Sequence, residues 1–192
     1  MMIDRRQEII AAATKSFTLF GYKATTMDQV AKIANVGKGT IYTFFSNKEE
    51  LFQEIAMTLI REMRIQTSEV ITDEANFMDN AHAALMKLLE FREEHLLFAK
   101  LIEEEKELRT PIVRQVLIDI ESAIIVYIAA YIQKAIDRDE IYPCDTELVS
   151  YLLFKGYLAF VVDWSELHDE ILPEGRILNL FKDTIFKGLI KA

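Results

Sequence analysis

Hydrophobic residues recur every three or four positions along almost the whole chain, and this spacing predicts an all-α protein. Near the beginning, Ile9, Phe17 and Phe20 share one helical face, so we expect a helix over residues 3–20. Gly21 follows directly, where a C-cap in left-handed geometry is expected to end this helix.

Capping motifs place the next three helices. Thr26 and Gln29 have the spacing of a capping box, which predicts a short second helix with Val30, Ile33 and Ala34 on its buried face. Residues 35–37, Asn-Val-Gly, interrupt the pattern before helical character resumes over residues 38–45. A second box, Ser46 with Glu49, predicts a long helix that continues to about Val70.

The rest of the chain keeps a helical period with few breaks. Thr110-Pro111 predicts a helix start, Asp145 an N-cap, and Pro173 the opening of the last helix. We therefore expect about nine helices and no sheet. The helices expected after residue 72 span about 73–91, 93–105, 111–137, 146–168 and 174–191.

Composition narrows the class of protein further. Of the 192 residues, 51% are hydrophobic and 28% are charged, which is enough to build a core and argues against disorder. The single cysteine, Cys144, has no partner for an internal disulfide and indicates a reducing compartment. We find neither a secretory signal nor a long uninterrupted apolar run, so we expect a cytoplasmic protein that does not enter a membrane.

The net charge of −9 is unevenly distributed. Residues 1–48 contain seven basic and three acidic side chains, a net of +4, which leaves −13 for the remainder. A basic head attracts phosphate while an acidic body is repelled by it, so this distribution would orient the molecule on DNA. The same excess would also fit ordinary variation in surface charge, and charge alone does not decide between the two.

Two short helices joined by a glycine-containing turn have the pattern of a helix-turn-helix, over about residues 26–45. In such a motif the second helix enters the major groove of DNA and the first helix supports it. We expect Ile41, Phe44 and Phe45 to anchor the second helix inward. The residues expected to face outward are Lys38, Gly39, Thr40, Tyr42 and Thr43.

The first quarter of the chain resembles the TetR family of bacterial transcriptional regulators. The resemblance is carried by three stretches that agree with the family pattern in order and spacing. These are Phe20-Gly21 with Thr25-Thr26 and Ile33-Ala34, then Gly37-Lys38-Gly39-Thr40-Ile41-Tyr42-Thr43-Phe44-Phe45, then Lys48-Glu49-Glu50-Leu51. The resemblance implies a three-helix DNA-binding head over residues 1–48 and a larger helical domain over residues 49–192 that binds a ligand and dimerises.

The resemblance also assigns roles to residues of the head. It implies that Thr25 and Thr26 contact backbone phosphate at the start of the second helix, that Tyr42 holds phosphate and that Lys48 clamps the flanking backbone. It places four residues at or near base edges: Lys38, Gly39, Thr40 and Thr43. Family members often carry an aromatic residue or histidine where Thr43 and Phe44 stand, so the operator sequence does not transfer.

In the larger domain, aromatic side chains with polar tips indicate a ligand cavity between helices, although the same residues would also suit a plain core. The pocket candidates are Phe98, Tyr127, Tyr131, Phe154 and Trp164. Small residues and an apolar stripe on the last two expected helices indicate a dimer interface, which a monomer could instead bury internally. The interface candidates are Gly156, Ala159, Ile177, Leu180, Phe181 and Ile185.

These patterns favour a ligand-responsive repressor that binds a palindromic double-stranded operator as a homodimer and is released by a small lipophilic effector. A transcriptional activator of the same fold is the first alternative, and a helical carrier or enzyme without DNA binding is the second. We identify no catalytic residues, no metal ligands and no cofactor motif. The effector could be a cationic lipophilic drug or a fatty-acyl compound.

Overall fold

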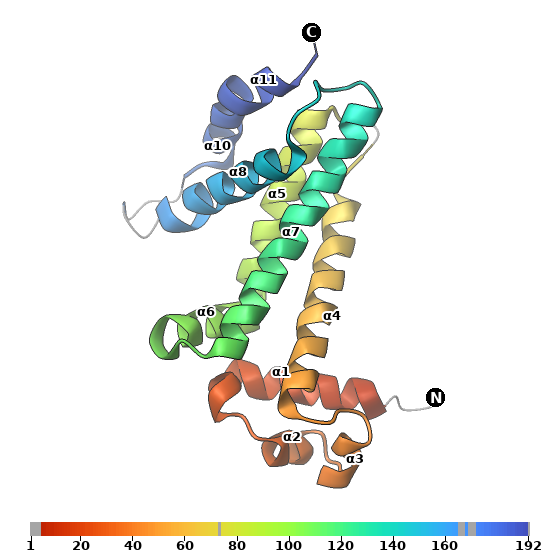
Figure 1. The fold of residues 1–192 in the computed structure, drawn as a ribbon. Helices are drawn as coiled ribbons and strands as arrows, with labels where there is room; N and C mark the ends of the chain where they lie inside the picture. The colour runs from red at the N-terminus through yellow and green to blue at the C-terminus, as the bar shows by residue number, and fades with distance from the viewer. Residues whose placement is uncertain (1–4, 73, 165–167, 169–171, 192) are drawn as a thin grey trace. The chain divides into compact units, whose positions relative to one another are not determined.

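The computed structural model describes residues 5–72, 74–164, 168 and 172–191. In this part of the chain the regular elements are helices, without a β-strand, and Ile141 and Ile190 form an isolated antiparallel bridge. When α8 is counted with the π-helical turn after it, and α10 with its two continuations, the described residues form nine continuous helical segments (Figure 1). This confirms the expected all-α class and the expected number of helices.

The chain divides into two compact units. One consists of the chain up to Glu62 and of Arg92–Glu121, and the other of Met63–Phe91 and the chain from Ser122 onward. Two long helices, α4 (Lys48–Glu69) and α7 (Pro111–Asp137), contribute residues to both units. The compact units therefore do not follow the expected division at residue 48, which stays a prediction about function.

The first unit holds the short N-terminal helices and α6. Its complete helices are α1 (Arg5–Ala24), α2 (Met27–Ile33), α3 (Lys38–Tyr42) and α6 (Leu96–Leu108). α1 packs against both α2 and α6. Its core contains Phe17 and Phe52, whose ring centroids lie 5.1 Å apart in an edge-on arrangement. Ile9, Ile41 and Leu51 are fully buried beside them.

Three expected details in this unit are corrected. Gly21 has φ 79° but ψ 170°, so it kinks the segment assigned to α1 and does not form the expected left-handed cap. The long helix is capped by Asn47, whose Oδ1 accepts the Glu50 N–H at 2.8 Å, one residue later than the Ser46–Glu49 box. Ile33 and Phe44, expected to be buried, are 38% and 40% exposed.

The second unit contains the end of α4, most of α5 and α7, and the C-terminal helices. These are α5 (Phe77–Glu94), α8 (Thr146–Leu158) continuing as η1 (Ala159–Asp163), and α10 (Glu174–Phe181) continuing as η2 (Lys182–Phe186) and α11 (Lys187–Leu189). Asp145 caps α8 as expected, because its Oδ1 accepts the Leu148 N–H at 3.1 Å. The expected continuation of this helix to His168 falls partly outside the described residues.

Helix α7 is long and apolar enough to cross a membrane by length and composition, with a mean hydropathy of 1.7 in its most apolar window. This corrects the expectation that no such helix would be found. The core helix of a soluble protein passes the same test, and α7 contributes buried side chains to both units, Val113 and Val116 to the first and Ile128 and Ile132 to the second. In its most apolar window, 28% of α7 is buried within the chain.

Candidate functional site

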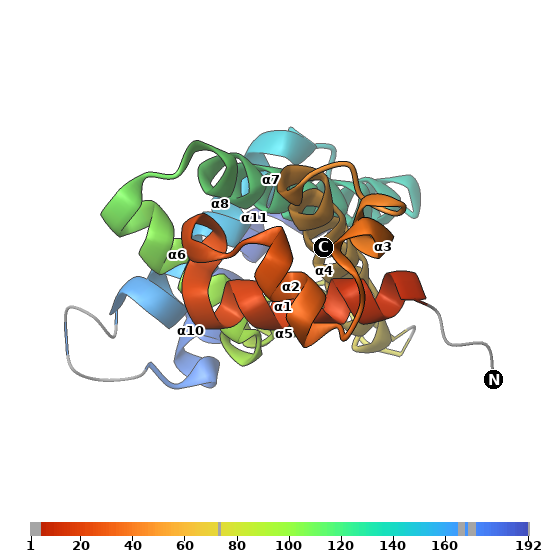
Figure 2. The same ribbon diagram turned by 90° about the horizontal axis from the view of Figure 1, so that it is seen from below.

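The helix-turn-helix is formed by α2 and α3 (Figure 2). Thr26 caps α2 with a complete capping box, because its hydroxyl accepts the Gln29 N–H and the Gln29 side chain accepts the Thr26 N–H. The turn then reverses through Asn35, whose φ of 53° is one of the left-handed conformations that asparagine tolerates. Ile41 and Phe45, exposed by 0% and 2%, anchor α3 to the core.

The outer face of α3 carries most of the side chains expected there. Lys38, Gly39, Tyr42 and Thr43 are exposed, whereas Thr40 is half-buried. A Cβ added at Gly39 would meet no atom within 4 Å, so the backbone is open to close approach there. Thr43 donates its hydroxyl to the Thr40 carbonyl at 2.6 Å, which fixes its side chain. This face can present hydroxyl, ammonium and apolar groups to a groove, and its contact with DNA stays a prediction.

Lys38 is paired across the turn with Asp28 on α2. Its Nζ lies 2.8 Å from Asp28 Oδ2, and both side chains are at least half exposed. The hydrogen bond to Asp28 raises the pKa of Lys38, with Coulombic attraction adding to it. Asp28 therefore competes with any phosphate for the charge of Lys38.

Thr25 is an interior residue, which corrects its expected role as a phosphate contact. Its side chain is 1% exposed, and its hydroxyl donates to the Gly21 carbonyl at 2.8 Å. The same oxygen is 3.1 Å from the hydroxyl of Ser16. Thr25 thus ties the end of α1 to the start of the helix-turn-helix, and Thr26 alone of the pair is exposed.

Lys48 is likewise occupied within the head. Its Nζ donates to the carbonyl oxygens of Tyr22 and Thr25, both at 2.8 Å, and lies 4.3 Å from the centre of the Tyr22 ring. Burial lowers the pKa of this ammonium group, while the charge of Glu104 acts in the opposite direction. Because a direct clamp on DNA would have to break these bonds, we reassign Lys48 as a positioning residue of the head.

Glu104 belongs to the acidic run over residues 103–107, whose pattern favours a solvated loop, but it is a buried residue of α6 that fastens α1 to α6. Its carboxylate is 4% exposed and accepts the backbone N–H groups of Tyr22 at 2.6 Å and Lys23 at 3.1 Å. It also accepts the Thr110 hydroxyl at 2.8 Å. A Cβ at Gly21 would come within 2.5 Å of this carboxylate, so the close approach requires glycine. In the sequence, Glu104 stands between Glu103 and Glu105, so the pattern does not indicate which of these residues is buried.

The second unit contains two pockets that share three lining residues, Ile71, Tyr127 and Tyr131. The outer pocket has a volume of about 420 Å³ and is lined by residues of α4 and α7 together with Ile71, Arg138 and Glu140, which lie just beyond these helices. The inner pocket has a volume of about 20 Å³ and is lined by apolar and aromatic side chains of α5, α7 and α8 together with Ile71.

Two of the five expected pocket residues, Tyr127 and Tyr131, line these pockets. The other three do not appear in their linings. Phe98 belongs to the first unit, where its ring lies edge-on to His95. Phe154 is a buried residue of α8, and Trp164 stacks on His168 with 3.8 Å between ring centroids.

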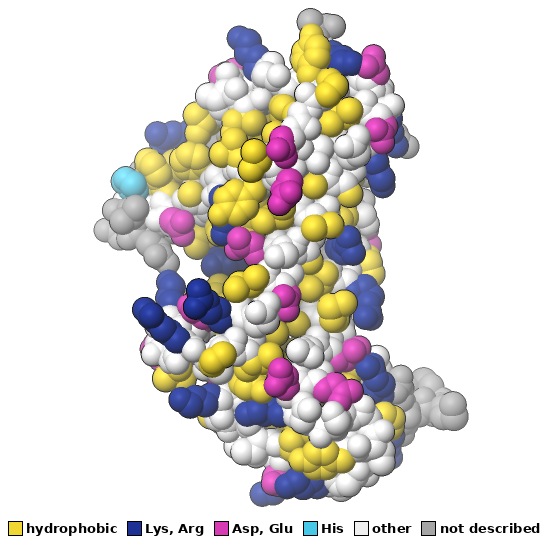
Figure 3. Space-filling model, viewed as in Figure 1, with side chains coloured by type: hydrophobic (Ala, Val, Ile, Leu, Met, Phe, Trp, Pro, Cys, Tyr) yellow, Lys and Arg dark blue, Asp and Glu magenta, His cyan; other side chains and the backbone are white. Residues whose placement is uncertain are grey.

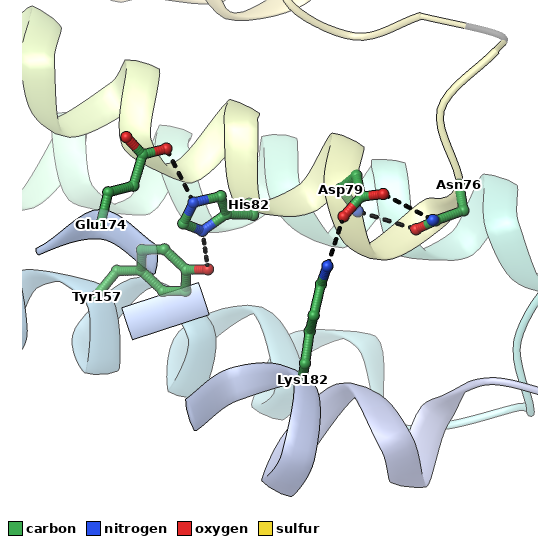
Figure 4. A network of polar contacts seen from close by, with 6 residues as sticks. All are labelled: Asn76, Asp79, His82, Tyr157, Glu174 and Lys182. Atoms are coloured by element: carbon green, nitrogen blue, oxygen red, sulfur yellow. Dashed lines mark hydrogen bonds and ion pairs between the residues drawn. The ribbon is translucent and has the colours of Figure 1, made fainter. Parts of the chain in front are cut away.

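A polar network joins α5 to α8 and α10 in the second unit (Figure 4). Buried His82 contacts the Tyr157 hydroxyl at 2.6 Å through Nδ1 and Glu174 Oε1 at 3.0 Å through Nε2. One turn away on α5, Asp79 pairs with Lys182 at 2.9 Å. Burial strongly raises the pKa of Tyr157, so its hydroxyl stays protonated and available for hydrogen bonding. The network fixes the C-terminal helices on α5.

The expected dimer residues separate into two groups. Ile177 and Phe181 are each 2% exposed, and a Cβ at Gly156 would lie 2.8 Å from the Phe181 ring, so these three pack within their own protomer. This corrects their assignment to a dimer interface. For these three residues the alternative applies, that the protomer buries them internally. Ala159 and Leu180 are exposed and Ile185 is half-buried.

Hydrophobic side chains instead gather on the outer surface over α8 and the neighbouring part of α7 (Figure 3). The large hydrophobic residues exposed on these helices in the second unit are Val126, Leu148, Tyr151 and Leu152. Leu148 and Leu152 are 67% and 52% exposed. An apolar surface of this kind is typical of a protein–protein interface.

Comparison with known proteins agrees with the helix-turn-helix geometry. Residues 9–55 match the family model described as bacterial regulatory proteins, tetR family. An HTH-type transcriptional regulator of Bacillus subtilis (strain 168), the uncharacterized YhgD, is 48% identical over 189 residues, which are 98% of each chain. The flavonoid-responsive regulator FrrA has the same fold, with a TM-score of 0.76 at 20% identity over 97% of both chains.

A further structure with this fold is the transcriptional regulator FadR from Bacillus subtilis in complex with stearoyl-CoA. It aligns with a TM-score of 0.69 at 21% identity, over 91% of this chain and 96% of that one. At these identities the two solved structures establish the fold, and the full-length relative carries the similarity at the level of sequence.

Proposed function

Because this chain belongs to the TetR family of bacterial transcriptional regulators, we propose that it is a repressor whose homodimer binds a palindromic operator and is released by a small lipophilic effector. The relatives compared here are regulators, so the chain is assigned to transcription regulation and not to enzymatic catalysis. The observation that carries the proposal is the exposed outer face of α3, held on a capped and anchored helix-turn-helix.

The head reads DNA through the N-terminal part of α3 and the residues that follow it. Tyr42 and Thr26 contact phosphate, while Lys38, Gly39, Thr40 and Thr43 lie at base edges. When the head binds DNA, the side chain of Lys38 leaves Asp28 and contacts the nucleic acid. Ile33 and Phe44, which are exposed beside these residues, add apolar contacts of the kind that suit a thymine methyl group.

Two copies of the head are needed to read a palindrome, since each contacts one half-site. The exposed apolar residues of α8 supply the surface that pairs the protomers, with Ala159 and Leu180 as further contacts. An apolar stripe exposed on one helix is buried when it packs against the same stripe of a second copy of the chain. Leu148, Tyr151 and Leu152 form the centre of this proposed interface.

Effector release follows from the continuity of α4, which begins in the first unit beside the helix-turn-helix and ends in the second unit at the pockets. A ligand that favours one arrangement of α4 over another shifts the population of head positions. Coupling of about 1–3 kcal/mol is sufficient for such a response. FadR, which has this fold, was solved with the lipophilic ligand stearoyl-CoA.

The proposal is tested by selecting operator sequences from a random duplex library with the purified full-length chain. We expect enrichment of a palindrome whose half-sites are one helical turn or a multiple apart, and a dimer mass by light scattering. Tyr42→Ala should abolish enrichment without changing that mass, whereas Leu152→Glu should give a monomer that no longer selects a palindrome.

A reporter with the selected operator placed at its promoter then separates repression from activation. Falling expression on addition of the chain supports the repressor, and rising expression supports the activator alternative. Failure to enrich any sequence at low salt would contradict DNA binding and leave the carrier alternative.

A further inference from the structure

The outer pocket of the second unit is lined by three basic side chains, although the chain as a whole is acidic. Arg64 comes from α4, Lys134 comes from α7, and Arg138 is the residue that follows α7. The single acidic residue in this lining is Glu140, whose Oε1 lies 3.9 Å from Arg138 Nη1. Arg64 lies over the ring of Tyr127, with 5.6 Å between its guanidinium carbon and the ring centroid. The pocket lining therefore has a local charge of about +2.

The positions of these residues follow from helix geometry. Tyr127, Tyr131 and Lys134 are spaced by four and three residues, so they share one face of α7. Arg138 follows the end of α7, where its backbone N–H donates to the Lys134 carbonyl at 3.1 Å. Arg64 and Ser68 are four residues apart on α4, and Ile71 follows the end of that helix. Thr67 lies in the same stretch of α4 and has a fully buried hydroxyl for which the described residues offer no hydrogen-bond partner. The wall of the pocket thus changes from aromatic to cationic along α7.

The inner pocket shares Tyr127 and Tyr131, the aromatic residues of that wall, with the outer pocket. None of the residues that line the inner pocket carries a charge, and its lining includes Phe77, Leu85, Leu88 and Leu153. The Phe77 and Tyr131 rings are stacked with 5.7 Å between centroids, so Tyr131 is both a wall of the outer pocket and part of the apolar packing. A molecule that spans both pockets would meet cations at one end and hydrocarbon at the other.

We infer that the effector site takes an amphiphile with an anionic head group and a linear apolar tail. This inference rests on the proposed function and specifies its ligand. The guanidinium groups of Arg64 and Arg138 and the ammonium group of Lys134 bind a carboxylate or phosphate head. A cationic lipophilic compound is disfavoured, because only Glu140 offers it a negative charge and Arg138 is beside that carboxylate.

The tail enters the inner pocket by displacing side chains. Its volume of about 20 Å³ has room for about one water molecule, which is far less than a hydrocarbon chain needs. A hydrocarbon chain must therefore move rings such as Phe77 and Tyr131 and separate the helices that carry them. Ile71, which lies just beyond α4, lines both pockets. Displacement of these rings therefore also shifts the C-terminal end of α4, the helix that leads to the head.

The test measures calorimetric binding of four twelve-carbon probes to the full-length chain without DNA, each below its micellar concentration. The probes are dodecanoate, dodecyl phosphate, dodecanol and dodecyltrimethylammonium. We expect at least one anionic probe to bind ten or more times more tightly than the cationic one. Comparing dodecanoate with dodecyl phosphate distinguishes a carboxylate head group from a phosphate head group. Shortening the tail by one methylene should weaken binding about fourfold.

Variants locate the site. Lys134→Gln and Arg64→Gln should each weaken the anionic probes about tenfold and leave dodecanol unchanged. Lys187→Gln is the matched control, since Lys187 is an exposed lysine of the same unit outside both pocket linings. Unaltered unfolding curves ensure that a loss of affinity reflects the missing charge.

Three results would overturn the inference: equal or tighter binding of dodecyltrimethylammonium, affinity that does not depend on tail length, or equal effects of the pocket and control variants. The same probes added to the operator complex separate this inference from the proposed function. Tight binding of an anionic probe with an unchanged complex supports the ligand class and contradicts ligand-driven release. Release by the cationic probe alone supports the proposed function and contradicts the ligand class.

Discussion

The carboxylate of Glu104 accepts the backbone N–H of Tyr22 across 82 positions of sequence, at 2.6 Å. The N–H of Lys23 and the hydroxyl of Thr110 complete the shell of donors around this carboxylate. The end of α1, from which the chain enters the helix-turn-helix, is therefore held by a side chain of α6.

Glu104→Ala should lower the free energy of unfolding by about 2 kcal/mol, because it leaves two backbone N–H groups at a buried position without an acceptor. Urea unfolding followed by circular dichroism measures this loss. Glu103→Ala is the control, since Glu103 is half exposed and pairs only with Lys100 three residues earlier, so it should change stability by less than about 0.5 kcal/mol. Equal effects of the two substitutions would show that Glu104 is not a structural fastening.

Lys48 and Lys38 should differ in what they affect. Lys48→Met should reduce both stability and operator affinity, because its ammonium group ties the carbonyls of Tyr22 and Thr25 together. Lys38→Met should reduce operator affinity with little change in stability, since its pair with Asp28 is exposed. Thermal unfolding and fluorescence anisotropy on the selected operator measure the two effects. A fully stable Lys48→Met protein with lost DNA binding would restore Lys48 as a direct phosphate contact.

Asp28→Asn should strengthen operator binding, since it releases Lys38 from its carboxylate partner. We expect a tightening of about three- to tenfold at low salt. The dependence of log K on log salt should change little, because Lys38 also leaves Asp28 in the wild-type complex and the number of neutralised phosphates stays the same. Anisotropy titrations over a series of salt concentrations test both values, and an unchanged affinity would contradict competition between Asp28 and DNA for Lys38.

Gly156→Ala should destabilise the second unit, although alanine is normally better than glycine within a helix by about 1 kcal/mol. The added methyl group would meet the Phe181 ring at 2.8 Å, and overpacking of this kind costs about 1–3 kcal/mol. Gly188→Ala should instead raise the free energy of unfolding, because nothing lies within 4 Å of the added methyl group. Combining Gly156→Ala with Phe181→Leu should cost less than the sum of the two single changes.

Acid should weaken the link between α5 and the C-terminal helices. The hydrogen bond from Lys182 holds the pKa of Asp79 below its ordinary value. A depressed carboxyl pKa stabilises the fold above the unfolded pKa, about 4, and this contribution is lost as the pH falls through the lower folded value. Asp79→Asn should therefore lower the melting temperature at pH 7, and this effect should shrink as the pH falls below about 4. Asp183→Asn, at an exposed neighbour of Lys182, should show no such difference.

Much of the fold was predictable because its signals are local. Capping residues act within four positions of sequence, so the starts of α2, α7 and α8 follow from Thr26, Pro111 and Asp145. The start of α4 was misplaced by one residue, because Ser46 and Asn47 are both good caps and both interact with the same glutamate. Only the geometry of the turn selects between them.

The site was less predictable, because it depends on contacts between distant segments. Thr25 has the sequence signature of a DNA contact, yet Ser16 and Gly21 surround its hydroxyl. The cations of the outer pocket come from helices some 70 residues apart, and each alone has the pattern of a solvated surface residue. A helical wheel of α7 would have revealed Lys134 beside Tyr127 and Tyr131, but not Arg64, which comes from α4.

The ring of Phe181 lies against Gly156 of α8, whereas Leu148, Tyr151 and Leu152 of the same helix are exposed. The contact with Phe181 is committed to the protomer's own last helix and tolerates little variation. The exposed residues are unconstrained by the fold and can diverge from one paralogue to the next. With α8 as the proposed interface, different regulators of this architecture would carry mismatched exposed side chains there, which would disfavour mixed assemblies without altering how any subunit folds.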